Sequence, residues 1–134
     1  MAMGTKIKGL TVEIGGDTTN LGKALDGVKK DSTALQKELG QVNKLLKFDP
    51  ENTELLAQKQ KILADSIEKT KEKLALLKNA EAQVQAQFAK GEISESQYRD
   101  FQREIIATEG KLKTYQKAAA DTADQVQNLG KAAD

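Results

Sequence analysis

The chain has 134 residues, and its 21 basic and 20 acidic side chains leave a formal net charge of +1, which provides no general attraction to nucleic acid or anionic lipid. It contains no cysteine and no histidine, so it offers no disulfide, no thiolate ligand and no imidazole for acid–base chemistry. Because no apolar run approaches the ~20 residues that span a bilayer, the composition favours a non-enzymatic protein without cofactor or metal, without a specific nucleic-acid site and without stable membrane association.

The first predicted element is a short β-strand close to the N-terminus. Leu10, Val12 and Ile14 alternate with polar residues, which is the period of two expected for a strand. Gly15 and Gly16 then permit a sharp turn, because glycine adopts positive φ values without steric cost. No second strand is evident in the sequence. The three apolar residues are therefore expected to pair with the same strand of another copy or to extend a partner's sheet, unless the segment is disordered.

Three long helices are predicted after this turn, over about residues 19–47, 50–90 and 95–130. Pro50 separates the first two because it disfavours helical backbone at the preceding residue. Asp49 is expected to cap the second helix, with Pro50 as its first residue. Gly91 is expected to end that helix in a left-handed conformation. Ser94 and Gln97 match the S-x-x-Q capping box, which predicts the start of the third helix.

Each predicted helix carries seam residues at alternating spacings of three and four, the 3.5-residue period of a coiled coil. In the first helix these helix-packing and oligomerisation residues are Leu21, Leu25, Val28, Leu35, Leu39, Val42 and Leu46. In the second helix they are Leu63, Ile67, Leu74, Leu77, Val84 and Phe88. In the third helix they are Tyr98, Phe101, Ile105, Leu112 and Tyr115. Most of the apolar side chains are thus expected to contact other helices rather than to line a pocket.

Polar residues interrupt the same seams, and these are Ser32, Thr70, Glu81, Thr108 and Thr122. Such residues are costly inside a tight coiled coil, yet they can specify register or the number of helices. Two interpretations stay open at this point. Either the polar residues specify register or oligomeric state, or they face the open side of an imperfect bundle.

These patterns predict an all-α fold. The short connection around Gly91 favours a third helix that folds back antiparallel on the second. The expected architecture is a long antiparallel helical hairpin or a three-helix coiled coil, preceded by one short N-terminal β-strand. Residues 1–16 would hold the strand and its glycine turn, and residues 17–134 the coiled-coil region.

Beyond periodicity, two segments have a distinctive residue order: IKGLTVEIGGDTT at residues 7–19 and VNKLLKFDP at residues 42–50. They are followed by NTELL at 52–56, QKQK at 58–61, QREII at 102–106 and TEGKL at 108–112. Together these segments resemble the N-terminal region of tail tape measure proteins. That family occurs in long-tailed bacteriophages and in prophages of Gram-positive bacteria.

The resemblance implies an elongated, largely helical protein that occupies the tail tube and whose length sets the number of tube rings. It implies that this chain is an N-terminal part of a longer one, assembled in the host bacterial cytoplasm and located in the virion tail. The implied partners are further copies of the chain and the tail tube, tail-tip and tail-assembly chaperone proteins. It assigns no catalytic residue. The alternative is a cytoplasmic binding module in which the helical hairpin clamps a partner or chaperone.

Overall fold

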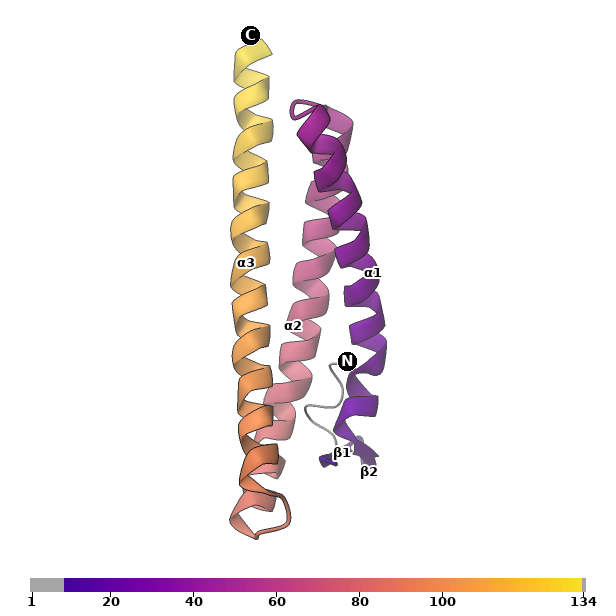
Figure 1. Ribbon diagram of the computed structural model, residues 1–134, viewed down its shortest axis with the longest axis vertical. Coiled ribbons are helices and arrows are strands. Elements are labelled where there is room, and N and C mark those ends of the chain that lie inside the picture. Colours follow the sequence, from indigo (N-terminus) through magenta and orange to yellow (C-terminus); the bar gives the residue numbers. More distant parts are fainter. Residues whose placement is uncertain (1–8, 134) are drawn as a thin grey trace.

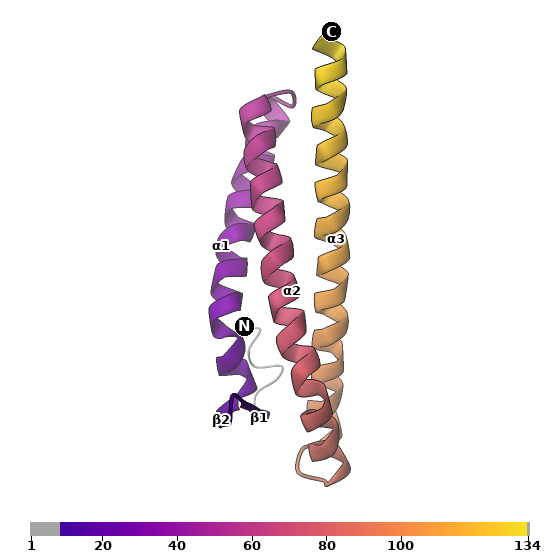
Figure 2. The same ribbon diagram turned by 180° about the vertical axis from the view of Figure 1, so that it is seen from behind.

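The computed structural model describes residues 9–133, with side chains described for residues 9–130. In chain order the elements are β1 (Thr11–Ile14), β2 (Asp17–Asn20), α1 (Leu21–Phe48), α2 (Thr53–Ala89) and α3 (Glu95–Ala133). The helices lie side by side with α2 between α1 and α3, and the small sheet sits at the start of α1, short of the turn that joins α2 to α3 (Figure 1). The view from behind gives the same order (Figure 2). The predicted all-α fold is therefore confirmed for the described residues, whereas residues 1–8 of the predicted N-terminal segment lie outside them.

The strand near the N-terminus has a partner within its own chain. β1 pairs antiparallel with β2, so that Ile14 lies opposite Asp17. Gly15 and Gly16 have φ values of 60° and 88°, as the two central residues of a type I′ hairpin turn require. The prediction that the chain holds no second strand is wrong. It failed because residues 17–20 are all polar and lack the apolar alternation of a strand, so the two strand-favouring threonines do not stand out, and the glycine turn brings the segment against β1.

Both edges of β1 form hydrogen bonds within the chain. β2 covers one edge. On the other, the Gln83 side chain accepts a hydrogen bond from Glu13 N (2.6 Å) and donates one to Glu13 O (3.0 Å), while Gln87 Nε2 donates to Thr11 O (2.7 Å). These amides of α2 take the place of a neighbouring strand for three of the backbone groups at this edge.

The apolar side chains of the hairpin are part of the core. Leu10 and Val12 are buried among side chains of α1, α2 and α3, whereas Ile14 is largely exposed. The cluster around them consists of Leu21, Leu25, Val28, Leu77, Ala80, Val84, Phe101 and Ile105. The alternation of apolar and polar residues in β1 therefore serves packing inside the chain, and pairing between chains stays a prediction.

The start of α2 differs from the prediction. Asn52 is the N-cap, and its Oδ1 accepts a hydrogen bond from Leu55 N at 2.9 Å. Asp49 instead ends α1, because its backbone N–H donates to the last turn of that helix. Pro50 consequently lies in the connecting turn and not in α2, so the predicted cap and first residue are wrong. At the start of α1, Asn20 provides the corresponding cap.

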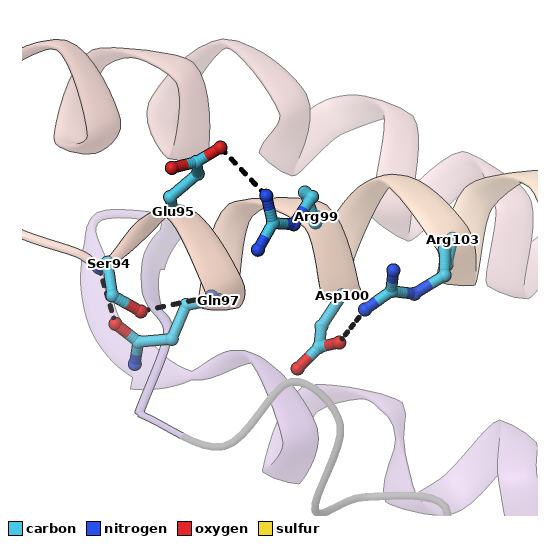
Figure 3. A network of polar contacts seen from close by, with 6 residues as sticks. All are labelled: Ser94, Glu95, Gln97, Arg99, Asp100 and Arg103. Atoms are coloured by element: carbon cyan, nitrogen blue, oxygen red, sulfur yellow. Dashed lines mark hydrogen bonds and ion pairs between the residues drawn. The ribbon is translucent and has the colours of Figure 1, made fainter.

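The connection from α2 to α3 forms as predicted. Gly91 has a φ of 74°, and its N–H donates to Phe88 O at 3.0 Å, which ends α2. Ser94 Oγ accepts a hydrogen bond from Gln97 N at 3.1 Å, and Gln97 Oε1 accepts one from Ser94 N at 2.8 Å (Figure 3). This reciprocal capping box begins α3 and directs it back along α2.

Candidate functional site

The predicted seam residues lie on the faces where the helices meet. The buried ones are Leu21, Leu25, Val28, Val42, Leu63, Leu77, Val84, Phe101 and Ile105. The half-buried ones are Leu35, Leu39, Leu46, Ile67, Leu74, Tyr98, Leu112 and Tyr115. Phe88 is the exception, because it lies partly exposed against Tyr98, with the two ring centroids 4.5 Å apart. The structure thus places these residues at contacts within one chain, and their role in self-association stays a prediction.

The buried face of α2 is wider than its seam. Leu56, Ile62, Ser66 and Ala80 are buried although the 3.5-residue pattern omits them. The reason is geometric: α2 packs against α1 on one side and α3 on the other, so it needs a broader buried stripe than a helix with one neighbour. Apolar residues beside the seam in the first turns of α2 are the sequence signal for this.

A buried ion pair joins α2 to α3. Lys73 Nζ lies 2.7 Å from Glu104 Oε1, and the two side chains are only 14% and 6% exposed. Neighbouring pairs of α3 are more exposed, with Arg99 bonded to Glu95 and Arg103 to Asp100 (Figure 3). Sequence reasoning missed the distinction, because Glu104 resembles the exposed acids around it. Only the packing of α3 on α2 reveals that it is buried.

A second ion cluster joins α1 to α2 at the surface. Lys69 Nζ lies 3.2 Å from Asp31 Oδ2 and 3.5 Å from Glu72 Oε2. The hydrogen bond to Asp31, followed by the negative charge of Glu72, raises the pKa of Lys69 above its ordinary value. Because a raised lysine pKa favours the folded state until the pH rises through that pKa, the contribution of Lys69 should be present at neutral pH and be lost in alkali.

Three of the polar seam residues converge on one cavity. Ser32 of α1, Thr70 of α2 and Thr108 of α3 line a space of about 120 Å³, called here the central polar cavity. Its other lining residues are Lys29, Thr33, Gln36, Lys73, Lys111 and Tyr115. The remaining two polar seam residues, Glu81 and Thr122, do not line it. The convergence could not be predicted from the single-helix patterns, because it depends on how the helices are staggered.

Two of the hydroxyl groups in this cavity are hydrogen-bonded to the backbone of their own helices. Thr70 Oγ1 donates to Ser66 O and Thr108 Oγ1 donates to Glu104 O, each at 2.7 Å, so both protons are held by helix carbonyls. Among residues 9–133 there is no group of three or more acidic side chains placed to hold a metal ion. No helix within that range has both the length and the hydropathy to cross a membrane.

The described surface also carries one exposed apolar patch at the turn between α1 and α2. Phe48 is 84% exposed, and with Leu45 and Leu55 it lines an open groove. Such a patch is a feature of interaction surfaces rather than of reaction sites. Comparisons of the chain with known protein families, with characterised proteins and with solved structures found no match.

Proposed function

We propose that this chain is a structural segment of a bacteriophage tail, namely the N-terminal segment of a tape measure protein. In this role it occupies the tail tube, contributes to setting tail length and acts through helix–helix association. The resemblance of residues 7–112 to that family suggests the role. The observation that carries it is the use of the apolar side chains: nearly all seam residues lie between packed helices and not around a ligand-sized pocket.

The dimensions of the helices support a role based on length. α2 has 37 residues and α3 has 39, so each is about 55–60 Å long at 1.5 Å per residue. If residues 53–133 formed one continuous helix, they would extend to about 120 Å. A segment that folds back in solution and opens in the tube would therefore double its reach without changing its helical content.

The seams provide a physical route for such opening. Residues that pack α3 onto α2 within one chain have the same 3.5-residue period that packs helices from different chains. We propose that other copies of the chain replace the intramolecular contacts when the segment is confined in the tube. In this proposal the further partners are the tail tube, tail-tip and tail-assembly chaperone proteins, and the chain catalyses no reaction.

A deletion in the phage tests this function. Tails purified from particles of the phage or prophage that encodes the chain should contain its peptides by mass spectrometry. Deleting residues 53–133 in frame should shorten the tails by about 120 Å in electron micrographs, since an extended helix contributes 1.5 Å per residue. Tails of unchanged length would contradict the ruler role, and tails without the peptides would contradict the assignment itself.

The exposed patch of Leu45, Phe48 and Leu55 favours one alternative, a helical binding module that clamps a partner or chaperone through this end of the hairpin. The same experiment separates the two functions. A clamp would leave its peptides in the cytoplasmic fraction and give tails of normal length after the deletion.

A further inference from the structure

We infer that the central polar cavity binds one small oxyanion, inorganic phosphate or sulfate, held between α1, α2 and α3. The inference is independent of the proposed tail function, because it depends only on the groups that line the cavity. Their charge, their free hydrogen-bond donors and the size of the space point to the same class of ligand.

The charge of the lining is positive and only partly compensated. Lys29, Lys73 and Lys111 reach the cavity from different helices, and no acidic residue lines it. Glu104 is bonded to Lys73. Lys29 and Lys111 make no ion pair with any residue that the structure describes. Two ammonium groups without an ionic partner beside a partly enclosed space favour an anion, because each can donate a charge-assisted hydrogen bond to it.

The neutral groups of the cavity add donors. Gln36 Nε2 donates to the Tyr115 hydroxyl at 3.3 Å, so the phenolic proton itself remains available to a ligand. Ser32 lines the cavity, and its hydroxyl makes no hydrogen bond within the described residues. A tetrahedral oxyanion would accept hydrogen bonds from both hydroxyl groups and from the lysines. A cation would be disfavoured, because the lining groups are mainly hydrogen-bond donors.

The size and access of the cavity select a small ligand. A volume of about 120 Å³ is several times the space that one water needs, which leaves room for phosphate or sulfate. Thr70 and Thr108 are buried and form the floor, while Lys29 is half-buried and Lys111 is exposed at the rim. A free anion can therefore enter from the side between α1 and α3, but a nucleic-acid strand cannot lie in the cavity.

Isothermal titration calorimetry of the whole chain tests the site. Sodium phosphate and sodium sulfate, added at constant ionic strength, should each give saturable binding of one anion per chain, and sodium chloride should give none. Lys111→Gln should weaken phosphate binding about tenfold, the loss expected for one charge-assisted hydrogen bond. Lys113→Gln is the matched control, because Lys113 is an exposed lysine of the same helix that does not line the cavity. The affinity of this variant for phosphate should stay within about twofold of that of the original chain.

A second variant keeps the test independent of lysine charge. Tyr115→Phe retains the ring and removes only the hydroxyl, so it should fold and bind phosphate several-fold more weakly. Phosphate and sulfate also stabilise proteins generally by exclusion from their surface, so a rise in melting temperature alone does not count as binding. Absence of saturable heat, or equal loss of affinity in Lys111→Gln and Lys113→Gln, would overturn the inference.

Discussion

Replacement of Phe101 by alanine is expected to lower the free energy of unfolding by about 3–5 kcal/mol. Phe101 is 1% exposed and is the largest of the fully buried side chains among the described residues. It belongs to the buried cluster that also contains Leu10 and Val12, so the truncation leaves a cavity in this core. Urea unfolding followed by circular dichroism at 222 nm measures the change.

Ile106 is the control for this variant, because it lies on the same helix and is 65% exposed. Ile106→Ala should change the free energy of unfolding by no more than about 0.5 kcal/mol. Since small domains are stable by about 5–15 kcal/mol in total, Phe101→Ala should still show a transition, at a lower urea concentration. Similar, small effects of the two variants would contradict the placement of Phe101 in the core.

Breaking the buried ion pair should have the next largest effect. Glu104→Gln keeps the size of the side chain but removes the negative charge beside Lys73, whose amine is mostly shielded from water. The expected loss is about 2–3 kcal/mol of unfolding free energy, because a buried ammonium loses its charged hydrogen-bond partner. Glu95→Gln removes the acid of an exposed pair with Arg99 and should cost less than about 0.5 kcal/mol.

The double variant Lys73→Met/Glu104→Leu separates the ion pair from simple packing. Replacing both charges by apolar groups of similar size should return the stability to within about 1 kcal/mol of the original chain, or raise it. The same urea titration provides the comparison. If the double variant were as unstable as Glu104→Gln, the effect would lie in local packing, and the account of an unpaired buried charge would fail.

The helices and their buried faces follow closely from the sequence, because helical periodicity is a local property. The 3.5-residue spacing predicts that Leu21, Leu63 and Phe101 contact other helices, and all three side chains are buried in the fold. The capping box at Ser94 is equally local, since both of its hydrogen bonds form within one helical turn. Local patterns of this kind can be interpreted without knowing how distant segments pack together.

The features that were missed depend on contacts between distant segments. The polar strand β2 has no apolar alternation to mark it, and it forms because the turn at Gly15 and Gly16 places it against β1. Likewise Gln83 and Gln87 have nothing in their sequence context that indicates contact with a strand some seventy residues away. Both features are specified by the tertiary arrangement and not by any local pattern.

The central polar cavity could be predicted from the sequence only in part. The sequence identifies Ser32, Thr70 and Thr108 as polar members of apolar seams, but it leaves open whether they specify register or face an open side. Their convergence depends on the stagger of the helices, which the periodicity of each helix alone cannot determine. The structure indicates a third possibility, namely that residues from separate helices form one site.

The central claim is that α3 folds back on α2 within a single chain, and one distance tests it most directly. The chain has no cysteine, so spin labels can be attached specifically at Lys78→Cys and Glu109→Cys, whose native side chains approach to 3.7 Å. Pulsed electron paramagnetic resonance should give a distance below about 25 Å between the two labels, since packed helix axes lie about 8–10 Å apart. This distance should persist when the labelled chain is diluted with unlabelled chain, because both labels are on the same molecule. A dominant distance near 46 Å, the length of about 31 residues of continuous helix, or a short distance that disappears on dilution, would contradict the folded-back hairpin.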